Sequence, residues 1–202
     1  MIRIQPIVEG YSEVETVPLL LRRLCQHLAP EVPVEVLHPI RVPKSKVLQA
    51  GGLEKAVELA GRRTSEGDLI LVIVDADTDC PATLGPALLA RATERRQDRH
   101  HLAVVAKTEF EAWFLTDIEA LSGQRGLRPG LLSPADPEAT KDAKGWLADH
   151  SHPDARYREV IDQPALAHLL HLERARKSPS FDKLYRGIAA SLGEHILHQP
   201  AA

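Results

Sequence analysis

Acidic residues follow two apolar segments of the chain, where side chains of this type could bind a cation. Glu9 comes directly after an apolar stretch near the N-terminus, and Asp75, Asp77 and Asp79 alternate after another. Three carboxylates this close repel one another unless a cation compensates their charge. Because oxygen ligands of this kind suit Mg²⁺ or Mn²⁺, we expect Asp75, Asp77 and Asp79 to bind a metal. Such a metal could activate water and stabilise charge developing on a phosphate group.

The alternating acids could also have a different role. Aspartates cap turns and helices without any chemical function. A calcium loop of the EF-hand type needs Gly and Glu where this chain has Cys80 and Pro86, so a loop of that type does not fit. A phosphotransferase of the haloacid-dehalogenase type also ends a strand in Asp-x-Asp. It usually has Thr at the position of Asp79 and places the pair after its first strand, so it stays a minor alternative.

The elements that would position these acids can be predicted from the hydrophobic pattern. The unbroken apolar run at 69–74 predicts a strand that is buried on both faces, as in a parallel sheet covered by helices. The whole pattern predicts strands at 2–8, 33–42, 69–74 and 102–106, a basic loop at 43–46, and helices at about 12–28, 53–64, 84–97, 109–121, 138–147, 163–175 and 180–197.

Alternating strands and helices favour an α/β fold with a mainly parallel sheet flanked by helices. Gly and Pro cluster from 123 to 137, after which only helices are expected. We therefore expect an α/β core at 1–121 and a C-terminal helical extension at 122–202 that packs on it within one structural domain.

The strand ends indicate where a site would form. Ligands of open parallel sheets gather beyond the carboxyl ends of the strands, so Glu9 and Asp75 should lie on the same edge. Glu109 and Glu111 follow the fourth strand and could contribute to a second metal site. Acids in a first helical turn are also favoured by the helix dipole alone.

Basic and hydroxyl side chains offer candidate phosphate ligands. Lys44 and Lys46 follow the second strand and could hold a phosphate near the carboxylates, although surface lysines are common. Lys177, Ser178 and Ser180 precede the last helix, whose free backbone amides could bind a phosphate or could be capped by a serine.

Bulk properties limit the classes of protein. The 202 residues carry a net charge of −3, with no apolar stretch long enough for a membrane span and no signal-peptide pattern. Two cysteines without metal or disulfide spacing suit a reducing cytoplasm. No Gly-rich phosphate loop is present, so ATP binding by that route is not expected.

Several motifs together resemble a known family. They are Glu9-Gly10 followed by Ser12-Glu13, Asp75-Ala-Asp77, Glu109-Phe-Glu111-Ala-Trp113, Asp142-Ala-Lys144 and Lys177-Ser-Pro-Ser-Phe181. The first two resemble motifs of Toprim domains. The set is similar to a bacterial family, domain of unknown function 4276, which is placed near nucleases of the overcoming-lysogenization-defect type.

The resemblance implies a Toprim-like (Rossmann-like) sheet, with Glu9 as general acid or base and with Asp75 and Asp77 as Mg²⁺ ligands. It also implies phosphodiester chemistry on nucleic acid and a partner ATPase in phage or mobile-element defence. We therefore expect a Mg²⁺-dependent nuclease. The alternatives are a non-enzymatic subunit that binds an ATPase or nucleic acid, and a small-molecule phosphohydrolase. Homo-oligomers are compatible with each alternative.

Overall fold

The structure, a computed structural model, describes residues 1–198. In chain order its elements are β1 (Ile2–Val8), α1 (Tyr11–Leu28), β2 (Val34–Val36), β3 (Ile40–Arg41), α2 (Lys44–Leu48), α3 (Gly52–Gly61), β4 (Leu69–Asp75), α4 (Pro81–Arg95), β5 (His100–Ala106), α5 (Ala112–Leu115), α6 (Ile118–Leu121), the 3₁₀ helix η1 (Pro137–Ala139), α7 (Ala143–Asp149), the 3₁₀ helix η2 (Pro153–Ala155), α8 (Glu159–Leu169), α9 (Leu172–Ala175) and α10 (Pro179–His198).

The strands form one parallel sheet in the order β2-β1-β4-β5, with the short β3 also paired to β1. Ile7 pairs with Val72, and Asp75 pairs with Ala106, so the strands end close together. The predicted α/β class with a mainly parallel sheet flanked by helices is confirmed.

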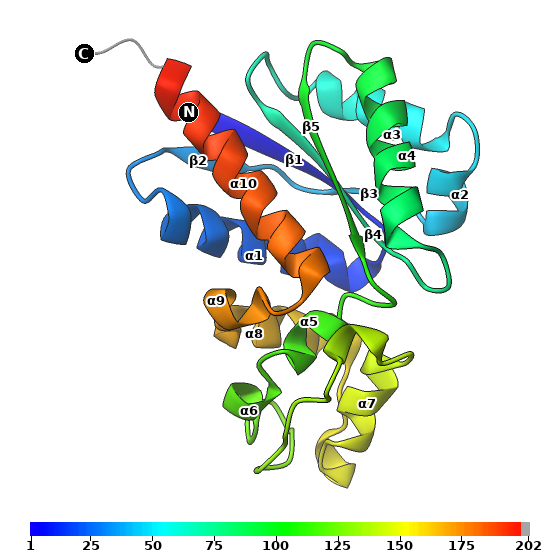
Figure 1. The fold of residues 1–202 in the computed structure, drawn as a ribbon, viewed down its shortest axis with the longest axis vertical. Helices are drawn as coiled ribbons and strands as arrows, with labels where there is room; N and C mark the ends of the chain where they lie inside the picture. The colour runs from blue at the N-terminus through cyan, green and yellow to red at the C-terminus, as the bar shows by residue number, and fades with distance from the viewer. Residues whose placement is uncertain (199–202) are drawn as a thin grey trace.

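Each face of the sheet is covered by helices, which explains why β4 is apolar throughout. Leu71 and Ile73 pack in a core that includes side chains of α1, α8 and α10. Ile70 and Val72 pack on the opposite face with side chains of α3 and α4. Figure 1 shows α1 and α10 on one side of the strands and α3 and α4 on the other.

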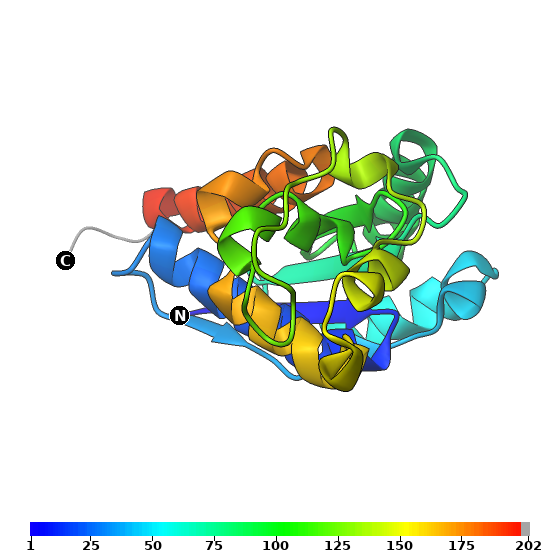
Figure 2. The same ribbon diagram turned by 90° about the horizontal axis from the view of Figure 1, so that it is seen from below.

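Residues after β5 form a helical layer beyond the carboxyl end of the sheet. In Figure 1, α5–α9 lie below the strands, and Figure 2 looks onto this layer, with α8 beside α1. The chain then returns through α10, which packs against β5 and α1. None of the helices at 1–198 combines the length and the apolar character that crossing a bilayer requires.

The single strand predicted at 33–42 is instead two short strands, β2 and β3. Between them the side-chain Nε2 of Gln5 donates to the backbone oxygen of His38 at 2.9 Å, and Pro39 has no N–H to continue the ladder. The predicted basic loop at 43–46 is also partly wrong, because the one-turn helix α2 begins at Lys44.

Three predicted helices are interrupted. The helix expected at 109–121 divides into α5 and α6 at Asp117, whose carboxylate accepts from the backbone N–H of His171 at 2.9 Å. The same contact separates α8 from α9, which were predicted as one helix at 163–175. The helix expected at 138–147 begins as η1 and continues as α7 after Asp142, which caps it through the N–H of Gly145.

Candidate functional site

Glu9 and Asp75 meet at the point where the strand order reverses. The chain leaves β1 for β2 through α1 on one face, and it reaches β4 on the other side of β1 through α3 on the opposite face. Parallel sheets bind their ligands at such a switch point. Here the backbone N–H of Asp75 donates to Oε2 of Glu9 at 3.3 Å. The predicted convergence of these two acids is therefore present.

Glu13 is a third acid at this point, from the first turn of α1. Its Oε2 accepts from the backbone N–H groups of Glu9 at 2.9 Å and Gly10 at 3.0 Å. Burial, together with the nearby charges of Glu9 and Glu111, raises the pKa of Glu13 to about 7. A Cβ at position 10 would lie 3.3 Å from Oε1 of Glu13, so a glycine leaves room for this carboxyl group.

Asp75 is held between the sheet and the segment after β5. Its Oδ1 accepts from the backbone N–H of Phe110 at 2.9 Å. Burial raises the pKa of Asp75 well above its usual value, and the carboxylates of Glu13, Glu111 and Glu9 raise it further. Burial also raises the pKa of Glu9. Glu9 and Glu111 thus raise the pKa values of both Glu13 and Asp75, and we call these four acids the carboxylate cluster.

Glu111 is the most deeply buried member of the carboxylate cluster. Its Oε1 accepts from the hydroxyl of Tyr157 and from Nε2 of Gln163, each at 3.0 Å. Its Oε2 is buried without a hydrogen-bond partner among the described residues. Burial raises the pKa of Glu111, while Lys144 opposes that shift. This oxygen could therefore accept a proton or bind a cation.

Lys144 is a positively charged side chain of the protein itself that lies beside the carboxylate cluster. Its Nζ lies 2.9 Å from Oε2 of Glu159 and 4.0 Å from Oε1 of Glu111. Although burial acts in the opposite direction, Glu111 and Glu159 raise the pKa of Lys144. Ser12 donates to Oε1 of Glu159 at 2.6 Å, which links α8 to the start of α1. The helical layer thus supplies charged groups to the edge of the sheet.

Asp77 and Asp79 were predicted to bind a metal, and in the structure both form ion pairs with Lys44. Their side chains are 57% and 47% exposed, and they lie 2.8 and 3.1 Å from Nζ of Lys44. Lys44 also donates to the backbone oxygen of Ala76 at 2.6 Å. The backbone of Asp77 has a φ of +50°, a left-handed conformation. The structure therefore places both acids beside a lysine. The charge of Asp77 still affects the carboxylate cluster, because it raises the pKa of Glu9.

The other predicted site residues are spread over three places. Glu109 accepts from the backbone N–H of Lys144 at 3.0 Å and so holds the start of α7. Lys46 lies exposed on α2. Lys177 is exposed before α10.

Ser178 and Ser180 are buried and are already bound to an acid of the protein. The hydroxyl groups of both residues donate to Oε1 of Glu138, and the backbone N–H of Ser180 donates to the same oxygen at 3.0 Å. A phosphate at the start of α10 would have to displace this carboxylate.

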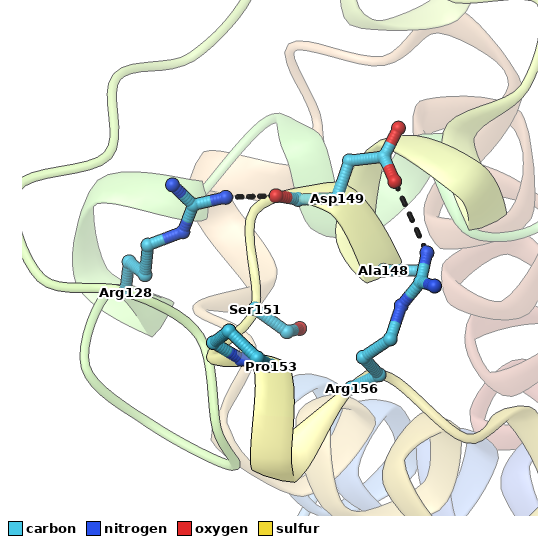
Figure 3. Close-up of a pocket in the computed structure, with 6 residues that line it drawn as sticks. All are labelled: Arg128, Ala148, Asp149, Ser151, Pro153 and Arg156. Atoms are coloured by element: carbon cyan, nitrogen blue, oxygen red, sulfur yellow. Dashed lines mark hydrogen bonds and ion pairs between the residues drawn. The ribbon is translucent and has the colours of Figure 1, made fainter.

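A separate hollow lies beside α7 (Figure 3). Arg128 donates to the backbone oxygen of Asp149, and Nη2 of Arg156 lies 3.1 Å from Oδ1 of Asp149. The lining consists of Arg128, Ala148, Asp149, Ser151, Pro153 and Arg156. Both arginines are thus bonded to Asp149, and no member of the carboxylate cluster lines this hollow.

The carboxylate cluster has some of the features of a metal site, but not all of them. Among the side chains that the structure describes, at residues 1–193, no three of His, Cys, Asp or Glu are arranged as a ready metal site. The donor chemistry still fits a hard cation, because the carboxylate cluster offers only oxygen atoms and Oε2 of Glu111 lacks a partner.

Several residues of the site were not predicted from the sequence: Glu13, Lys144, Tyr157, Glu159 and Gln163. Glu13 had a visible signal, since it lies one helical turn after Glu9, but the same position suits an N-terminal cap. The others lie far along the chain, on α7, on α8 and in the loop before α8. Lys144 stood in the Asp142-Ala-Lys144 motif, but nothing in the sequence says how these segments dock.

The fold and the site define a class: an α/β protein with a parallel sheet and a carboxylate cluster at its switch point. The family model of a domain of unknown function, DUF4276, matches residues 8–189, and the chain belongs to that family. No curated protein and no solved structure matches the chain. The matched range includes the whole carboxylate cluster and Lys144.

Proposed function

We propose that this protein is a metal-dependent enzyme that cleaves phosphodiester bonds in nucleic acid, with Mg²⁺ or Mn²⁺ bound at the carboxylate cluster. The observation that carries the proposal is the convergence of Glu9, Glu13, Asp75 and Glu111 at the switch point, with one buried oxygen left unpartnered. Burying several acids together costs free energy, and a bound cation would offset that cost.

Asp75 and Glu111 are the residues that would hold the metal, with Glu9 and Glu13 beside them. When bound, the metal would lower the pKa of a water molecule and stabilise charge on the phosphate. Glu9 is half-buried and has a raised pKa, so it can hold or release a proton closer to neutral pH than a solvent-exposed glutamate. Glu13 keeps Glu9 and Gly10 in place through two backbone hydrogen bonds.

Lys44 would contribute positive charge at the open side of the site. Although burial acts in the opposite direction, its hydrogen bonds to Asp77 and Asp79 raise its pKa, so it stays protonated. An approaching phosphate could compete with these two exposed acids for the lysine. In this proposal Asp77 and Asp79 position Lys44, and direct metal binding by them needs a rearranged loop.

Two finer features of the proposal come from the family resemblance: a Toprim-like sheet, and work with a partner ATPase in defence against phages or mobile elements. A cytoplasmic location is proposed from the two cysteines, which lack disulfide or metal spacing. A second candidate is a non-catalytic subunit that binds an ATPase or nucleic acid. Its support is that Lys144 already lies beside Glu111 and Glu159, so the fold partly neutralises its acids without a metal.

Nicking of supercoiled plasmid, together with cleavage of single-stranded DNA and RNA, tests the proposal in the presence of Mg²⁺ or Mn²⁺. We expect Glu9→Gln and Asp75→Asn to lower the rate at least about a hundredfold, the scale of a lost acid–base group. Glu15→Gln, an exposed acid on the same helix as Glu13, serves as the matched control and should cleave normally.

Two results would count against this enzyme. Equal rates for the native protein and Glu9→Gln would overturn the catalytic proposal. A calorimetric titration with Mn²⁺ that shows no binding at millimolar metal would favour the non-catalytic subunit instead.

A further inference from the structure

Tyr11 differs from the other phenolic and phenyl side chains of the protein. It is 72% exposed, whereas the three phenylalanines and the other two tyrosines are buried. An aromatic ring left in water forgoes the free energy that burial would give. Tyr11 is the first residue of α1 and follows Glu9 and Gly10 directly, so its backbone lies at the edge of the carboxylate cluster.

Arg41 covers part of this ring. Its guanidinium carbon lies 3.8 Å from the ring centroid, which is a close cation–π contact. Arg41 ends β3, where it pairs in register with Val8 of β1. Across the carboxyl edge of the sheet the order is therefore Arg41, then Glu9, then Asp75.

The protein contains a second tyrosine–arginine contact, in which both residues have further partners. Arg176 lies 4.2 Å from the ring of Tyr185, but Tyr185 is 8% exposed and its hydroxyl donates to Glu173 at 2.5 Å. Arg176 is also paired with Asp182 and Glu173. By contrast, in the part of the chain that the structure describes, the Tyr11 hydroxyl has no hydrogen bond and Arg41 has no carboxylate partner.

We infer that Tyr11 and Arg41 form a stacking platform for an unpaired base of a single-stranded nucleic acid whose backbone lies at the carboxylate cluster. This inference rests on the proposed function and names its substrate class. Aromatic rings and guanidinium groups both stack on nucleobases, and the stacking tolerates any sequence. A ring that its neighbour already orients loses little freedom when a base stacks on it.

The platform predicts a preference for single strands. Bases of a duplex are already stacked on each other, so one of them reaches Tyr11 only after unstacking. Single-stranded DNA or a frayed end should therefore bind more tightly than a blunt duplex of the same sequence. Arg41 adds a charge that attracts the adjacent phosphate, so this binding should weaken with salt.

Binding of fluorescein-labelled single-stranded DNA, followed by anisotropy with Mg²⁺ present, tests the platform on a Glu9→Gln background that prevents cleavage. We expect Tyr11→Ala to weaken binding about tenfold, as loss of one stacked base should. Tyr11→Phe should bind within about twofold of the parent, because it keeps the ring. Leu59→Ala removes an exposed apolar side chain from α3 and should change nothing.

The outcomes separate this inference from the proposed function. If Tyr11→Ala binds single strands as tightly as its parent, or if duplex binding depends on Tyr11 equally, the platform is wrong even where metal-dependent cleavage occurs. If single strands bind through Tyr11 but the native protein never cleaves with Mg²⁺ or Mn²⁺, the platform stands and the proposed enzyme fails.

Discussion

Glu111 has a buried carboxylate oxygen, Oε2, that accepts no hydrogen bond from any described group. The groups around Glu111 determine how much this missing hydrogen bond costs in stability. A buried acceptor left without a partner costs about 1–3 kcal/mol, and more when it is charged. Tyr157 and Gln163 donate to the other oxygen, Oε1, while Lys144 lies 4.0 Å away from it. The remaining oxygen can be satisfied by a proton or by a bound cation.

Tyr157→Phe tests how much of this arrangement depends on one hydroxyl group. We expect the free energy of unfolding to fall by about 2 kcal/mol at pH 8, where Glu111 is more ionised, because hydrogen bonds to charged groups are the stronger ones. At pH 5 the loss should be smaller, since burial raises the pKa of Glu111 and more of it is protonated. Urea unfolding at both pH values measures the difference.

Tyr185→Phe is the matched control for that experiment. The hydroxyl of Tyr185 also donates to a glutamate, Glu173, but the Glu173 side chain is 55% exposed and water can replace the bond. Its loss should be smaller and nearly the same at both pH values. A Tyr157→Phe variant with the stability of the native protein at pH 8 would contradict the role assigned to this hydroxyl.

At the scale of elements, Asp117 connects two segments of the helical layer. Its carboxylate accepts from the backbone N–H of His171 at 2.9 Å and from its ring Nδ1 at 2.7 Å, and Nη1 of Arg174 lies 3.2 Å away. The side chain of Asp117 is only 1% exposed. This one residue therefore begins α6 and also fixes the start of α9.

Asp117→Asn should destabilise the protein by about 2–3 kcal/mol, because a buried acceptor of several charge-assisted bonds becomes neutral. Urea unfolding followed by circular dichroism measures the loss. Asp98→Asn is the control, since the Asp98 side chain is 55% exposed and water can replace its ion pairs with Arg96 and Arg99, so its loss should be smaller. Equal losses for the two variants would show that Asp117 is no more than a surface pair.

The same elements show what could be predicted from sequence and what could not. The apolar run of β4 and the acids that follow β1 and β4 were sufficient to predict a parallel sheet with Glu9 and Asp75 together. The alternation of Asp75, Asp77 and Asp79 suggested three ligands of one metal. The backbone turn at Asp77 and the position of Lys44 depend on how α2 packs, which a local pattern does not encode.

Interruptions of helices were missed for a related reason. Asp117 fits a helical pattern, but its bonds to His171 and Arg174 come from residues more than fifty positions away. The docking of α7 and α8 likewise brings Lys144 and Glu159 to the sheet edge. Long-range tertiary contacts of this kind override local propensity.

For the whole molecule, the helical layer beyond the sheet determines how far the carboxylate cluster is removed from water. Glu13 and Glu111 are buried, while Glu9 is only half-buried and Tyr11 is open to solvent. Burial raises the pKa values of Glu13 and Asp75, whereas the ring of Tyr11 is exposed and contacts Arg41. Protonation of the cluster is therefore coupled to the stability of the entire fold.

Without metal, the free energy of unfolding should fall as the pH rises from about 4.5 through 7. The pKa of Glu13 is about 7 in the folded protein against 4.5 for an ordinary glutamate, so the folded state binds more protons in this window. Linkage then makes stability decrease with pH, by on the order of 3 kcal/mol for Glu13 alone. Millimolar Mg²⁺ should reduce this decrease if it binds the ionised carboxylates.

Glu13→Gln isolates the contribution of this residue in denaturant titrations between pH 5 and 8. Burial lowers the pKa of His101, which makes stability increase with pH up to about 6.5 and partly masks the effect in the native protein. The difference in free energy of unfolding between the native protein and Glu13→Gln does not contain the contribution of His101. As the pH rises, the variant should become steadily more stable relative to the native protein. A constant difference across the range would mean that Glu13 is ionised throughout, and the buried cluster would then need another source of charge compensation.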